Sequence, residues 1–128
     1  MPQYAMIVYS PAPADPRAFT PEYLELLDTY PAQAAALGGK ILGGTYFSKQ
    51  RGFALNPISS AMAVDGDTVR RGTLMESDLV VTAFYVVAAP DIEVAVQIAK
   101  LNPANREGGV EVRPLFKPDG QMQDDYAD

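Results

Sequence analysis

Short apolar runs alternate along this chain with two segments of helical period. The runs Tyr4–Tyr9 and Leu79–Ala88 are rich in β-branched and aromatic residues, which predicts two strands, the longer one central. Ile41–Phe47 predicts another strand. The alternating segment Val110–Phe116 predicts a last strand, and its Pro114 favours the edge of a sheet because proline cannot donate a ladder hydrogen bond.

Two helices are expected between these strands. Thr20 and the proline that follows it are a start signal for a helix over Pro21–Leu37. Pro31 lies inside that segment and is expected to kink or interrupt the helix, because its ring clashes with the preceding turn. Pro90-Asp91 opens a second helix with apolar positions at a period of 3.6 residues, and Asn102-Pro103 ends it.

A β-hairpin separates the two halves of this pattern. Ser60–Val64 and Thr68–Arg71 flank Asp65-Gly66, a pair typical of tight hairpin turns. With the hairpin treated as an insertion, the order predicts an α+β, ferredoxin-like fold, an antiparallel sheet with two helices on one face. The other face would remain apolar and exposed, so we expect a homodimer that covers it.

Composition excludes several classes of protein. The chain has 128 residues, a length typical of one domain, and it contains neither cysteine nor histidine. The commonest general base and the commonest metal ligand are therefore missing, and no metal site is expected. The net charge is −6 and no basic cluster exceeds Arg70–Arg71, so nucleic acid is not an expected partner. With no signal peptide or bilayer-spanning run indicated, we expect a cytoplasmic protein without a membrane partner.

Two further features bear on cofactors and on boundaries. The glycine pairs Gly43-Gly44 and Gly108-Gly109 lack the spacing of phosphate-binding loops, so no nucleotide cofactor is expected. Residues 117–128 carry one positive and four negative side chains and almost no apolar ones, which predicts a flexible acidic tail after a domain at 1–116.

Several segments together resemble the YCII-related DGPF family. They are Arg71–Glu76, at the position of the Asp-Gly-Pro-Phe-Ala-Glu signature, the strand Ala83–Val87, the turn Leu101–Ala104 and the closing Gly109–Leu115, which reads GVEVRPL. The resemblance implies a dimeric α+β barrel, in which two such domains pack their sheets around a shared cavity. Arg71, Thr73 and Leu74 replace the signature Asp, Pro and Phe. A His-Asp pair proposed as catalytic in some relatives has no counterpart in this histidine-free chain.

Candidate site residues follow from the polar groups near these segments. Glu76 and Asp78 are candidate catalytic bases, and the alternative is that they are solvated loop charges. Arg71 and Arg113 are candidate anion-binding groups. The alternative for Arg113 is a structural bond to loop carbonyls or to Glu111 of a partner chain. Strand tyrosines are candidate hydrogen-bond donors to a ligand or simply core residues: Tyr9, Tyr46 and Tyr85.

Two hypotheses about function remain open. The first is a small-molecule-binding protein, a cofactor-independent lyase, isomerase or cyclase that uses these carboxylates, tyrosines and arginines in a dimer cavity. An oxygenase without a cofactor is a variant of it. The second is a non-catalytic regulatory or interaction module in which the family's site has been lost. The loop Ser48–Pro57 is either a lid beside the cavity or a surface insertion.

Overall fold

The computed structural model describes residues 1–45, 54–55 and 57–116. The predicted acidic tail, Tyr46 and most of the Ser48–Pro57 loop lie outside the described residues. The elements in chain order are β1 (Gln3–Pro11), the short 3-10 helix η1 (Pro16–Ala18), α1 (Pro21–Ala36), β2 (Lys40–Gly44), η2 (Ile58–Ser60), β3 (Met62–Asp65), β4 (Thr68–Arg71), β5 (Leu79–Ala88), α2 (Ile92–Lys100), η3 (Pro103–Arg106) and β6 (Gly109–Pro114).

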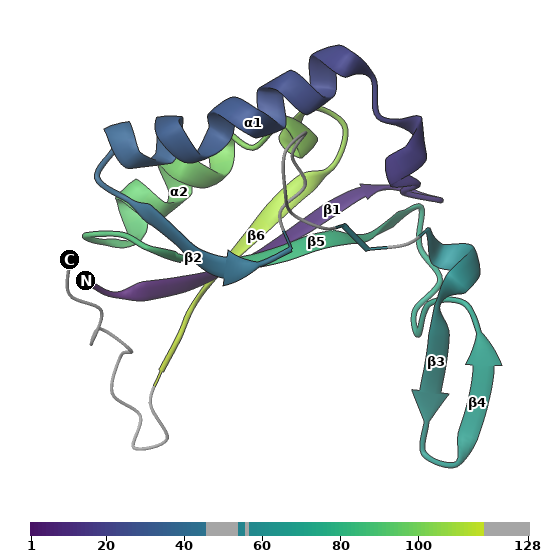
Figure 1. Ribbon diagram of the computed structural model, residues 1–128. Helices are drawn as coiled ribbons and strands as arrows, with labels where there is room; N and C mark the ends of the chain where they lie inside the picture. The colour runs from purple at the N-terminus through teal and green to yellow at the C-terminus, as the bar shows by residue number, and fades with distance from the viewer. Residues whose placement is uncertain (46–53, 56, 117–128) are drawn as a thin grey trace.

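Four strands form one antiparallel sheet in the order β2-β5-β1-β6. Helices α1 and α2 lie together on one side of this sheet (Figure 1). The α+β class is therefore confirmed, and the strand order is compatible with a ferredoxin-like plan. β5 is central and β6 is an edge strand, both as the sequence predicts.

Helix α1 begins where its sequence signals predict. The Thr20 hydroxyl accepts a hydrogen bond from the Tyr23 amide at 3.1 Å, and Pro21 occupies the first helical turn. Pro31 was expected to kink or interrupt the helix, and an interruption is wrong, because α1 continues through this residue to Ala36. Tyr30 and Ala34, on either side of this proline, are buried against the sheet, so tertiary packing holds the helix together where local preference opposes it.

The core lies between the helices and the sheet. Along β1, Tyr4, Met6 and Val8 are buried and the residues between them are more exposed, which is the alternation of a strand covered on one face. Tyr85 of β5 pairs directly with Met6, and Ile98 of α2 is fully buried above them. Asp91 caps α2 by accepting a hydrogen bond from the Val94 amide at 2.9 Å.

The side of the sheet away from the helices, called the open face below, is apolar along the central strands β1 and β5. Ile7 of β1 pairs with Phe84 of β5, and Ala5 pairs with Val86. Because Phe84 is 51% exposed, a large aromatic side chain at the centre of this sheet faces solvent in a single chain.

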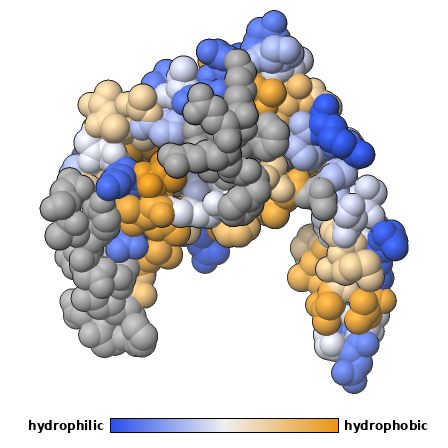
Figure 2. Space-filling model, in the orientation of Figure 1, coloured by the Kyte–Doolittle hydropathy of each residue, from blue (hydrophilic) through white to orange (hydrophobic). Residues whose placement is uncertain are grey.

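The strands β3 and β4 form the predicted hairpin, called the arm below, which projects from the body on the side of the sheet opposite the helices (Figure 1). Gly66 supplies the positive φ of its turn, +60°. Three large apolar side chains of the arm are more than half exposed: Met62, Val64 and Val69. Figure 2 shows apolar surface along the arm. By cross-strand pairing and alternation these three share one face of the ribbon.

Candidate functional site

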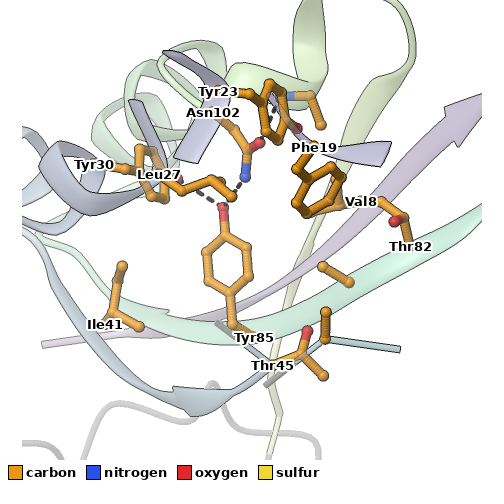
Figure 3. A pocket seen from close by; sticks show the side chains of 13 residues that line it. Val8, Phe19, Tyr23, Leu27, Tyr30, Ile41, Thr45, Thr82, Tyr85 and Asn102 are labelled. Carbon is orange, nitrogen blue, oxygen red and sulfur yellow. Dashed lines mark hydrogen bonds between the residues drawn. The ribbon is translucent and has the colours of Figure 1, made fainter. Parts of the chain in front are cut away.

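A cavity of about 60 Å³ lies between α1 and the helix-covered face of the sheet, called the inner cavity below. Figure 3 shows its side chains, which converge from α1, from the sheet strands and from the segment after α2. The lining is mostly apolar, with hydroxyl and amide groups at a few points: Val8, Phe19, Tyr23, Leu27, Tyr30, Ile41, Thr45, Ala54, Thr82, Ala83, Tyr85, Asn102 and Ala104.

A chain of hydrogen bonds crosses one wall of the inner cavity (Figure 3). The Asn102 amide nitrogen donates to the Tyr85 hydroxyl at 2.8 Å, and the hydroxyls of Tyr85 and Tyr30 are 2.7 Å apart. Because the single Tyr30 proton goes to the Ile98 carbonyl at 3.1 Å, Tyr85 must donate to Tyr30. Each hydroxyl therefore donates once and accepts once, and the chain runs in one direction from Asn102 to Ile98.

Three parts of the fold position this series of hydrogen bonds. Tyr85 rises from the centre of β5, and its ring meets that of Tyr30 of α1 edge-on, with centroids 6.0 Å apart. Asn102 follows α2, and its side-chain oxygen accepts a hydrogen bond from the Ala104 amide at 2.9 Å, which starts η3. One asparagine thus joins the turn after α2 to the tyrosine pair.

Burial controls the charge state of these groups. It is the largest cause that raises the pKa of Tyr30 and of Tyr85 above the ordinary value of 10.0. Both tyrosines are accordingly neutral hydrogen-bonding groups at physiological pH. They do not provide a phenolate base.

A larger groove of about 430 Å³ adjoins the inner cavity and is called the outer groove below. The two spaces share four lining residues, which we call the neck: Phe19, Tyr23, Thr82 and Ala104. Charged side chains occur only on the outer side of the neck among the described lining residues of these two spaces: Asp15, Arg106 and Glu107. A ligand that extends through the neck would thus pass from a polar exterior to an apolar interior.

A β-bulge places Thr82 at the neck. Val8 pairs with Ala83 and Tyr9 pairs with Val81, so Thr82 is an extra residue in β5. A bulge re-aims the side chain of its extra residue, and both Thr82 and Ala83 line the inner cavity as a result. The sequence contains no signal that would locate this bulge.

The candidate residues predicted from sequence do not form one cluster in a single chain. Tyr85 lies in the inner cavity. Arg113 pairs with Ala5, which places it on the open face, on the other side of the sheet from Tyr85. It forms an ion pair with Glu111 of the same chain, at 3.7 Å, and both side chains are largely exposed. Tyr9 also belongs to the open face by strand alternation.

The remaining candidates lie at the base of the arm. Arg71 is exposed and donates a hydrogen bond to the Ser59 carbonyl at 3.2 Å. Glu76 and Asp78 are also exposed, in the connection between β4 and β5, and neither lines the inner cavity or the outer groove. Tyr46 lies outside the described residues. From the Ser48–Pro57 loop, Ala54 lines the inner cavity.

Sequence reasoning overlooked Asn102, Tyr30 and Tyr23 as site residues. The sequence pattern marks Asn102 only as a helix stop, and Tyr23 and Tyr30 only as residues of the helix expected over Pro21–Leu37. A buried tyrosine hydroxyl requires a partner, so Tyr30 on an apolar helix face was a signal in itself. Its partners come from distant segments, and only the fold reveals them.

Comparison with known proteins adds no assignment, because neither a protein-family model nor a curated protein matches this chain. Within the described ranges, no helix has the length and apolar character needed to cross a membrane. What the geometry defines is thus an α+β domain with a small, mostly apolar cavity between its helices and its sheet.

Proposed function

We propose that this chain is a small-molecule-binding protein whose ligand occupies the inner cavity and extends through the neck into the outer groove. The feature that carries this role is an apolar space with a few fixed polar groups, which is the usual composition of ligand sites. A ligand that fills this space would remove its apolar side chains from water, which favours binding.

Binding is favoured over acid–base catalysis in this cavity. The polar groups among its described lining residues are tyrosine and threonine hydroxyls and one amide, all of them neutral at physiological pH. The cofactor-independent lyase, isomerase or cyclase stays a hypothesis about the opposite side of the sheet. It requires a second chain to bring Glu76, Asp78 and Arg71 against Tyr9 and Arg113.

The binding role is tested with three six-carbon probes: 1-hexanol, hexanoate and hexylammonium. Chemical-shift changes in the NMR spectrum of the wild type should map to the inner cavity, with dissociation constants near 1 mM, a free energy of about −4 kcal/mol. Ala83→Leu fills the cavity and should abolish these shifts, whereas Ala35→Leu, at an exposed position of α1, should leave them unchanged. Absence of binding by all three probes would refute the role.

We also propose that two copies associate through their open faces, as in a dimeric α+β barrel. Ile7, Phe84 and Val86 present apolar area there, and an uncovered apolar sheet face of this kind usually marks an interface. The apolar face of the arm supports the same idea, because a two-stranded hairpin is only marginally stable alone. An arm that packs against a second copy would gain a partner surface that the described residues of its own chain do not supply.

Sedimentation of the purified chain tests this association. We expect a dimer at micromolar concentration, converted to a monomer by Phe84→Lys on the open face or by Val64→Lys on the arm. Thr68→Lys, on the opposite face of the arm from Val64, is the matched control and should remain dimeric. A wild-type chain that sediments as a monomer would refute the dimer and, with it, a catalytic site shared between chains. The regulatory or interaction module would then need another partner.

A further inference from the structure

We propose that the ligand is an uncharged molecule with an apolar end in the inner cavity and one hydroxyl or carbonyl group at the neck, bonded to Tyr23 and Thr82. This inference rests on the proposed function and names the class of ligand that the same site would take. It follows from a difference between the polar groups around the cavity. Some already form hydrogen bonds within the protein, and others do not.

Most polar groups of the inner cavity are committed to the protein. The Thr45 hydroxyl donates to the Phe84 carbonyl at 3.1 Å and accepts from the Phe84 amide at 2.9 Å. The Tyr30 and Tyr85 hydroxyls each donate once and accept once in the series of hydrogen bonds that starts at Asn102. None of these hydroxyls can donate a hydrogen bond to a ligand without breaking an internal one, so they line the cavity and do not bind a polar group.

The neck differs from the cavity walls. Within the described part of the chain, the hydroxyls of Tyr23 and Thr82 make no hydrogen bond, although both side chains are half-buried. Both residues line the inner cavity and the outer groove, and the ring of Phe19 lies 4.8 Å from that of Tyr23. No buried side-chain polar atom of the described residues lacks a partner, so these two hydroxyls are open to solvent and each is available to a polar group of a ligand that is otherwise apolar.

The charges around the neck oppose each other and favour an uncharged group. Asp15 is already paired with Arg17, at 2.8 Å. Arg106 and Glu107 both line the outer groove, together with the neck residues Tyr23 and Thr82, so a positive and a negative side chain face the same space. An ionic head group there would lose hydration without gaining a counter-charge of one sign, which is costly. A hydroxyl or a carbonyl group loses much less hydration, and it gains hydrogen bonds to the hydroxyls of Tyr23 and Thr82.

The experiment compares the same three probes, which share one alkyl chain and differ in their head groups. We expect 1-hexanol to bind the wild type more tightly than hexanoate or hexylammonium does. Tyr23→Phe and Thr82→Val should each weaken 1-hexanol by about 3- to 10-fold, the effect of one lost hydrogen bond. Tyr9→Phe and Thr68→Val remove the same groups elsewhere and should leave its affinity unchanged. NMR spectra of all variants verify that the fold is retained.

The results separate this inference from the proposed function. If hexanoate or hexylammonium binds more tightly than 1-hexanol and Ala83→Leu abolishes that binding, the cavity is a ligand site and the uncharged class is wrong. If neither Tyr23→Phe nor Thr82→Val weakens 1-hexanol, the neck hydroxyls do not hold its head group and the inference is overturned. If no probe binds, or Ala83→Leu leaves binding intact, the proposed function fails as well.

Discussion

The hydroxyls of Tyr30 and Tyr85 should be energetically coupled, and a double-mutant cycle measures that coupling. Tyr85→Phe removes the acceptor of the buried Asn102 amide, and Tyr30→Phe removes the acceptor of the Tyr85 proton. Each change leaves one buried donor unsatisfied, at a cost of about 1–3 kcal/mol in the free energy of unfolding. The double variant removes the Tyr85 donor together with its acceptor. Its cost should therefore be smaller than the sum of the single costs, by about 1 kcal/mol.

The assay is urea unfolding of the four proteins of the cycle, followed by circular dichroism. Tyr9→Phe is the matched control, because Tyr9 is only partly buried and its hydroxyl makes no hydrogen bond within the described part of the chain. It should change stability by less than about 0.5 kcal/mol. Costs for Tyr30→Phe and Tyr85→Phe that add within about 0.5 kcal/mol would refute the directed chain of hydrogen bonds that we derive from the geometry.

Three further predictions concern the same scaffold. Because burial raises the pKa of Tyr30 and Tyr85, the unfolded chain releases their protons near pH 10 while the folded chain retains them; stability should fall above that pH, by up to about 1.4 kcal/mol per pH unit for each tyrosine, and the double Phe variant should lose less in unfolding titrations. Asp91→Ala removes the cap of α2 and should lower the unfolding free energy by about 1 kcal/mol, whereas an unchanged value would show that the cap is unimportant. Gly44→Ala should destabilise by more than about 1 kcal/mol, because φ is +116° there and a Cβ would overlap the Phe84 carbonyl; Gly43→Ala, where a Cβ meets nothing, is its control in thermal melts.

The order and type of the elements could be read from local pattern. The β-branched run Leu79–Ala88 matches β5 at both ends, since a strand buried on one side needs apolar residues wherever it meets the core. Start signals likewise located α1 and α2, because Thr20 with Pro21 and Pro90 with Asp91 act within one turn of the chain. Pro31 was the exception. A local rule predicted an interruption, and burial of Tyr30 beside it outweighed that rule.

The site was decided by tertiary structure. Tyr85 was a candidate from the sequence, but its partners Tyr30 and Asn102 are 55 and 17 residues away in the chain, and only the packing of α1 and α2 on the sheet brings them to it. The position of the signature motif was the reason to propose Glu76, Asp78 and Arg71 as site residues. Position in a motif does not determine which side of a sheet a residue faces. That depends on register and on bulges such as the one at Thr82, where a single extra residue turns a side chain towards the cavity.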